Sequence, residues 1–276
     1  MGIGISNWQL ARAVASRGQL GVVSGTSLDN VMARRLQEGD PGGHMRRAAA
    51  HFPNGEISRA VLDKYYVAGG KTAGQAFAPV PLYTVQPRMD LIQLTVLANF
   101  VEVFLAKEGH GGEVGINLME KIQMPTMASL YGAILAGVDY VLMGAGIPRE
   151  IPGIMDLLAQ QRAATQKLSV ENASDDVTMH FDPLAVMGME LPALKRPRFL
   201  AIIASVTLAL ALLKRSTGQI DGFIIEAPSA GGHNAPAPGP VATHRGRRAA
   251  LRPQGRGRLG KDKGSGIAFL AGWFAH

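Results

Sequence analysis

The residues best placed to do chemistry lie in one loop that follows a buried apolar strand. Segment 222–226 reads GFIIE, a short β-branched run that predicts a buried strand rather than a helix. Loop 229–234 comes next and contains the adjacent glycines Gly231 and Gly232, followed by His233. Two glycines let the backbone approach a ligand or adopt a positive φ, and an imidazole titrates near neutral pH. We therefore expect His233 at the carboxyl end of this strand, where parallel α/β folds carry out chemistry.

Strands and helices alternate along the rest of the chain, as they must to position such a loop. Apolar runs predict further strands at 19–24, 113–118, 139–143 and 199–204. Helical spacing and end signals predict helices at 6–18, 28–37, 89–107, 125–137 and 206–214. Ser6 is the expected N-cap of the first of these helices. Further helical structure is expected within 44–68, and another helix is expected to end at Leu158. Segment 163–198 reads as an excursion with short strands near 167–170 and 177–181.

This alternation predicts an α/β fold with a parallel sheet or barrel. The sequence contains no GxGxxG or Walker-type phosphate loop, so a barrel is favoured over a doubly wound nucleotide-binding sheet. The chain has no cysteine, which excludes disulfides, thiolate catalysis and cysteine-ligated metals, and we expect no metal site.

Hydropathy indicates neither a membrane span nor a signal peptide. The longest apolar run, 199–213, is shorter than the roughly 20 residues needed to cross a bilayer, and it reads as a strand followed by a helix. The N-terminal residues MGIGIS lack a charged region followed by an apolar stretch. We therefore expect a cytoplasmic protein that does not associate with membranes.

The positive charge of the chain is confined to its C-terminal end. Residues 241–276 contain eight Lys and Arg residues and one acidic residue, whereas residues 1–240 contain 20 basic and 20 acidic residues. A neutral body does not predict nucleic-acid binding. A protein that binds RNA or DNA through the basic segment 245–263 remains the alternative from a different functional class.

Three segments resemble one enzyme family. They are IIEAPSAGGHNAP, GINLMEKIQMPTMASLYGAILAGVDYVLMGAGIPREIPG and MGIGISNWQLARAVASRGQLGVVSG. In combination they resemble the nitronate monooxygenase (2-nitropropane dioxygenase) family of FMN-containing (β/α)8 TIM barrels, which is related to flavin-dependent enoyl-carrier-protein reductases. The resemblance covers residues 1 to about 240. It implies that residues 1–240 form a partial FMN-binding TIM-barrel domain.

The resemblance also implies a set of site residues. His233 corresponds to the active-site histidine beside the flavin ring, and Gly231 and Gly232 let the backbone approach that ring. Asn117 is expected to hydrogen-bond the flavin from a second strand end. Met1 and Gly2 match the glycine-rich turn after the first barrel strand. The remaining cofactor-binding candidates, Ser205 and Glu226, also lie at strand ends. For these two and for Asn117, simple strand-end capping is as good an explanation as flavin contact.

The implied reaction is the oxidation of an alkyl nitronate by FMN and O₂ to a carbonyl compound. His233 would pair with the anion when protonated, or act as a base on a neutral nitroalkane. The alternative enzyme is an enoyl reductase, in which the same flavin delivers hydride from a nicotinamide. In either case the flavin carries the redox chemistry and the protein supplies orientation.

Residues 241–276 depart from the family, which continues with an acidic turn, a helix and a further strand. Synonymous codons exist for which this segment, read one base later, encodes those three features. We interpret 241–276 as a basic, irregular frameshift product, and we expect 244–265 to be poorly packed. We also expect Met1 to be an internal methionine of a longer frame, since the first barrel strand is missing. The barrel would then be incomplete and its activity impaired.

Overall fold

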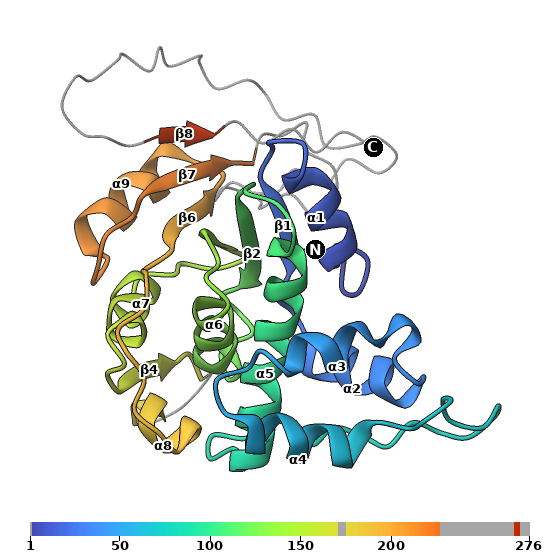
Figure 1. Cartoon of the computed structure of the whole chain (residues 1–276). Helices are drawn as coiled ribbons and strands as arrows, with labels where there is room; N and C mark the ends of the chain where they lie inside the picture. The colour runs from blue at the N-terminus through green and yellow to red at the C-terminus, as the bar shows by residue number, and fades with distance from the viewer. Residues whose placement is uncertain (1, 171–174, 227–267, 271–276) are drawn as a thin grey trace, which may run out of the picture.

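A parallel β-sheet forms the centre of the protein (Figure 1). The structure is a computed structural model, and it describes residues 2–170, 175–226 and 268–270. The strand order is β1-β2-β3-β6-β7-β8, and every neighbouring pair is parallel. The strands are β1 (Gly21–Ser24), β2 (Val114–Met119), β3 (Tyr140–Gly144), β6 (Arg198–Ile203), β7 (Gly222–Ile225) and β8 (Ala268–Leu270).

The predicted α/β class is therefore correct, and the five predicted sheet strands are present. Within the described residues β1 and β8 are the two edges of the sheet, and no pairing closes it. The strand order follows the chain order, as it does in a parallel barrel, but closure into a (β/α)8 barrel stays a prediction.

Helices cover one face of this sheet. Alternate residues of each strand point toward that face and pack against the helices. Val23, Ile116 and Phe199 are fully buried on that face, in one core with the helices. Complete burial of such side chains contributes about 1.5–3 kcal/mol each. The helices are α1 (Trp8–Ala15), α2 (Leu28–Gln37), α3 (His44–Ala49), α4 (Gly55–Tyr65), α5 (Met89–Lys107), α6 (Thr126–Leu135), α7 (Ile151–Ala159), α8 (Pro183–Met187) and α9 (Val206–Arg215), with a 3₁₀ turn at Pro41–Gly43.

Helix α5 is the centre of the helical layer, as its apolar residues on every side predict. In the described part of the chain it is the one helix long and apolar enough to cross a membrane, and most of it is buried in the protein. Gly132 of α6 lets the two helices approach closely, since a Cβ there would lie 2.1 Å from the Val96 carbonyl oxygen. Buried Glu102 accepts hydrogen bonds from the Trp8 N–H at 2.8 Å and from Arg35 at 2.6 Å, so it joins α1 and α2 to α5.

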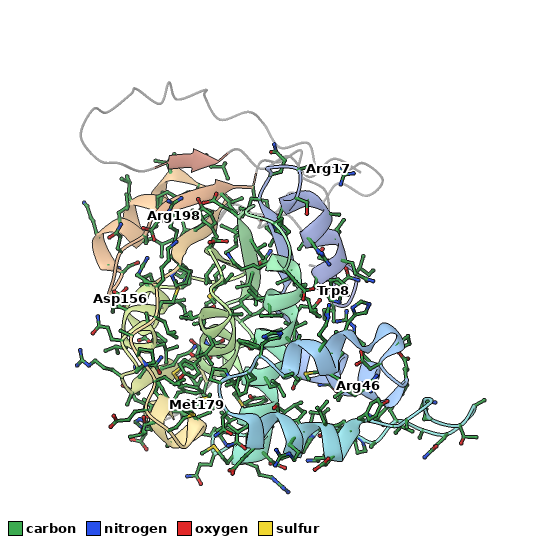
Figure 2. The ribbon with its side chains drawn as sticks, viewed as in Figure 1. Trp8, Arg17, Arg46, Asp156, Met179 and Arg198 are labelled. Carbon is green, nitrogen blue, oxygen red and sulfur yellow. The ribbon has the colours of Figure 1, made fainter. Side chains whose placement is uncertain are left out.

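The start of the first helix differs from the prediction. Asn7, not Ser6, is the N-cap of α1, because its extended backbone lets its side-chain oxygen accept the Leu10 N–H at 3.1 Å. The Ser6 carbonyl instead accepts the Ser24 N–H at 2.8 Å, which holds the start of this helix at the end of β1. Trp8, labelled in Figure 2, is buried, and its ring centroid lies 4.9 Å from that of His44.

An antiparallel hairpin is inserted between β3 and β6. Its strands are β4 (Ala164–Leu168) and β5 (Val177–Phe181), and α8 follows. The prediction of 177–181 is correct, but the first strand starts three residues earlier than the predicted 167–170. The buried face of β4 includes Gln166, and a polar residue at that position hides the alternation that would otherwise predict a strand.

Candidate functional site at the carboxyl ends of the strands

Parallel pairing brings the carboxyl ends of β1, β2, β3, β6 and β7 to one edge of the sheet. Asn117 of β2 lies between Ser24 of β1 and Leu142 of β3 in the register. The N-terminal turn reaches the same edge. The Gly2 carbonyl accepts the Ile5 and Ser6 N–H groups at 3.0 and 2.9 Å, and the Ser6 carbonyl accepts the Ser24 N–H. The structure thus places Gly2 and Asn117 at the same edge.

Ser24 and Asn117 carry unused hydrogen-bonding capacity on the sheet face away from the helices. Their chain neighbours Val23 and Ile116 point into the helical core, so Ser24 and Asn117 point to the opposite face. Ser24 is 3% exposed, and its Oγ has no hydrogen-bond partner among the described residues. Asn117 is half-buried, and its amide makes no hydrogen bond to a described side chain or backbone group. Buried polar groups are normally paired, so this hydroxyl requires an explanation.

That face is apolar around the two polar side chains. Tyr140, Leu142 and Leu200 form a small buried cluster on it, and half-buried side chains surround this cluster: Leu20, Val22, Ile202 and Ile224. A planar apolar ligand that also accepts and donates hydrogen bonds would suit such a surface.

The two weaker candidates lie at the same edge. Ser205 is the N-cap of α9, and its Oγ accepts the Leu208 N–H at 3.3 Å, so its hydroxyl is engaged in capping. Glu226 directly follows β7, and its N–H donates to the Ile203 carbonyl at 2.8 Å. Met1, Gly231, Gly232 and His233 lie outside the described residues, as does the segment 244–265.

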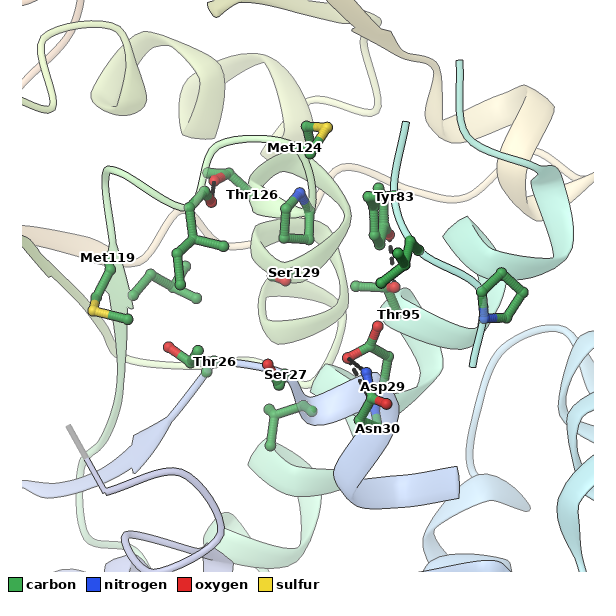
Figure 3. Close-up of a pocket in the computed structure, with 17 residues that line it drawn as sticks. Thr26, Ser27, Asp29, Asn30, Tyr83, Thr95, Met119, Met124, Thr126 and Ser129 are labelled. Carbon is green, nitrogen blue, oxygen red and sulfur yellow. Dashed lines mark hydrogen bonds between the residues drawn. The ribbon is translucent and has the colours of Figure 1, made fainter. Parts of the chain in front are cut away.

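A cavity opens beside this edge, beyond the ends of β1 and β2 (Figure 3). Its volume is about 210 Å³. Its walls come from the start of α2, the loop at 81–83, α5, the end of β2 and the start of α6. Apolar side chains make up much of the wall, and the polar groups include Asp29, Tyr83 and Thr95.

Asp29 is a buried carboxyl group in this cavity. It is 8% exposed, and Oδ1 accepts hydrogen bonds from the Asn30 N–H at 2.8 Å and from the Asn30 side-chain amide at 3.3 Å. Burial raises the pKa of Asp29, and the bonds from Asn30 offset part of that effect. The Tyr83 hydroxyl donates to Thr95 Oγ1 at 2.6 Å, and burial raises the pKa of Tyr83 above its usual range.

A second, larger cavity of about 840 Å³ lies beyond the end of β3, against the β4–β5 hairpin. Charged groups of both signs surround it: Glu120, Arg149, Glu150, Lys167, Asp175, Asp176 and Arg215. Lys167 and Asp176 form an ion pair at 2.5 Å. Because the charges are mixed, the cavity has no clear preference for an anion or a cation. Among the described residues no group of three or more His, Asp or Glu is arranged to hold a metal ion.

Comparisons of the chain with protein-family models, curated proteins and solved structures gave no match.

Sequence reasoning missed the two most informative polar residues at this edge. Ser24 reads only as the last residue of a strand, and Asp29 reads as a helix-opening acid. Their segment, SGTSLDN at 24–30, is rich in polar residues directly after a buried strand, which is a signal for a functional loop.

Proposed function

We propose that this chain is an FMN-dependent oxidoreductase of the nitronate monooxygenase type, which oxidises alkyl nitronates with O₂ to carbonyl compounds. The observation that carries the proposal is the buried Ser24 hydroxyl, which has no hydrogen-bond partner within the described part of the chain, next in the sheet register to Asn117. Both lie at the strand ends where such barrels bind their ligands. The sequence motifs that contain these strand ends favour a flavin over other planar ligands.

The residues present fit the edge of a flavin ring. In this proposal Asn117 and Ser24 hydrogen-bond the polar edge of the ring, and the apolar cluster of Tyr140, Leu142 and Leu200 lies near its body. The turn at Gly2 borders the same edge. When bound, FMN supplies the electron acceptance and the reaction with O₂.

His233 supplies the remaining chemistry in the proposal. A protonated imidazole would hold the nitronate anion, and a neutral one would take the proton from a neutral nitroalkane. The neighbouring Gly231 and Gly232 would let the backbone approach the ring. We further propose that the complete fold is a (β/α)8 barrel in a cytoplasmic enzyme, and that a frameshift before 241–276 impairs the present chain.

The first experiment measures flavin binding by the full chain. FMN affinity is read from flavin fluorescence for the wild type and for Asn117→Ala and Ser24→Ala. We expect each substitution to weaken FMN binding about tenfold, the effect of one lost hydrogen bond of about 1.4 kcal/mol. Ser205→Ala is the matched control, because its hydroxyl is engaged in capping, and it should leave the FMN affinity unchanged. Equal affinities for all four proteins would contradict the proposed flavin contacts.

The second experiment measures turnover in a chain with the reading frame across 241–276 restored. Oxygen consumption with an alkyl nitronate should fall by roughly 10²-fold in His233→Ala, while the flavin content is retained. Nicotinamide-dependent reduction of an enoyl thioester without nitronate turnover would assign the enoyl reductase activity instead. Salt-sensitive binding of RNA or DNA, without bound flavin, would indicate a nucleic-acid-binding protein instead.

A further inference from the structure

The cavity around Asp29 presents hydrogen-bond acceptors and a negative charge, with no cation to balance them. Asp29 forms no ion pair with a described residue, and the hydrogen bonds that Oδ1 accepts from the next residue come from the neutral backbone and side-chain amide of Asn30. A buried carboxylate without a positive partner is costly, and an incoming cation would offset that cost.

The hydroxyl groups of Tyr83 and Thr95, which line the same cavity, also favour a ligand that donates hydrogen bonds (Figure 3). Tyr83 donates its proton to Thr95 Oγ1, and Thr95 Oγ1 donates in turn to the Leu91 carbonyl at 2.9 Å. Both hydroxyl protons are thus used within the protein. The lone pairs of the Tyr83 oxygen remain as acceptors, so a ligand here must bring its own N–H or O–H groups.

The size and the other walls of the cavity define the rest of the ligand. A volume of about 210 Å³ exceeds the roughly 150 Å³ of an engineered cavity that holds benzene, and it is too small for most drug-sized ligands. Apolar side chains surround the polar groups and would cover a compact hydrocarbon body: Leu28, Leu82, Leu118, Ile122, Met124 and Pro125.

We propose that this cavity is a binding site for a small organic cation, a primary ammonium group on a compact apolar body, with Asp29 as its counter-ion and Tyr83 as a second acceptor. The ammonium offers three donors, which can serve the Asp29 carboxylate and the tyrosine oxygen together. Charge-assisted hydrogen bonds of this kind are about twice as strong as neutral ones.

The test uses benzylamine, which is protonated at neutral pH, as the probe, and the full chain without added flavin. Benzyl alcohol and benzoate are the matched comparators, because they keep the ring and change the head group. Binding is measured by NMR titration of the protein. We expect saturable binding of benzylammonium, at least tenfold weaker binding of benzyl alcohol, and no binding of benzoate.

Two variants locate the site. Asp29→Asn keeps the shape of the side chain and removes its charge, and it should weaken benzylammonium binding at least tenfold. Tyr83→Phe should weaken it a few-fold. Asp63→Asn on α4 is the control, since Asp63 is exposed and distant in the chain, and it should bind as the wild type does.

Several results would overturn the proposal: equal affinity for benzylammonium and benzyl alcohol, unchanged binding in Asp29→Asn, or no saturable binding of the amine. The comparison of the three ligands needs no variant, so the test stands even if a substitution disturbs folding. The assay contains no flavin, so failure of this proposal and failure of the flavin proposal are distinguishable.

Discussion

The two ends of the parallel sheet are built in opposite ways. At the amino end, polar groups are paired with one another and with the backbone. At the carboxyl end, within the described ranges, Ser24 Oγ has no hydrogen-bond partner and Asp29 has no cationic partner. The contrast separates the part of the molecule that stabilises the fold from the part that is free to bind a ligand.

The amino end repeats one arrangement twice. Asp221 directly precedes β7, and its Oδ2 accepts the Phe199 N–H and Arg196, both at 2.7 Å. Asp139 directly precedes β3, and its Oδ2 accepts the Val114 N–H at 2.8 Å and pairs with Lys107. Each carboxylate thus fixes the first residues of a neighbouring strand and holds one cation.

Arg196 extends the first arrangement to a helix. It pairs with Asp156 of α7, labelled in Figure 2, and donates to the Gln219 and Pro197 carbonyls at 2.6 and 2.9 Å. The carboxyl end differs, because no described residue hydrogen-bonds Ser24 Oγ and none supplies a cation to Asp29. The paired polar groups at the amino end stabilise the sheet, whereas polar groups at the carboxyl end are available to hydrogen-bond a ligand.

Removing a paired carboxylate from the amino end should have the largest effect. Asp221→Ala leaves Arg196 and the Phe199 N–H without their shared acceptor, and we expect a loss of roughly 2–4 kcal/mol in unfolding free energy. Urea unfolding monitored by circular dichroism measures this loss. Asp63→Ala on the exposed face of α4 should stay within about 0.5 kcal/mol. Equal losses for the two variants would remove the distinction between the amino end and an ordinary surface.

Asp29→Asn should raise the unfolding free energy, by less than Asp221→Ala lowers it. Because burial raises the folded-state pKa of Asp29, its contribution to stability is present at low pH and is lost as the pH rises through that folded-state pKa. The variant cannot lose a proton at this position. Its unfolding free energy should therefore match the wild type below pH 3.8 and exceed it by a margin that grows as the pH rises through the folded-state pKa. A difference that does not grow with pH would mean that Asp29 is not strained by burial.

Ser24→Ala should have the smallest effect on the protein without ligand. The Oγ has no partner to lose and its removal relieves a buried polar group, so unfolding free energy should change by less than about 0.5 kcal/mol or rise slightly. Thermal unfolding with and without FMN measures this. Ser205→Ala is the contrast, since loss of the α9 cap should cost about 1 kcal/mol. A large loss in Ser24→Ala would indicate a hidden structural role.

The sequence predicts the sheet strands well because each is a short apolar run with clear boundaries. It predicts α5 because a helix that is apolar on every side must be buried. It fails where a single residue decides the geometry. Asn7 replaces Ser6 as a cap through its backbone conformation, and Gln166 hides the start of β4.

Part of the site could be predicted and part could not. Asn117 is recognisable as a polar residue at a strand end. Whether the Ser24 hydroxyl has a hydrogen-bond partner depends on which groups the fold brings near it, and a sequence pattern does not contain that information. The importance of Asp29 likewise depends on a cavity formed by four separate segments of the chain.

The pairing of β1 with β2 has a consequence for the order of folding. Gly21 pairs with Val114 roughly 90 positions away, whereas Gly115 pairs with Tyr140 about 25 positions away and Leu200 with Gly222 about 20 positions away. Closing the longer loop costs about 1 kcal/mol more in chain entropy. Local pairings also form faster than distant ones. The unit of α5, β2, α6 and β3 should therefore assemble early, and β1 should join it later, bringing the Ser24–Asn117 edge together only in the last steps.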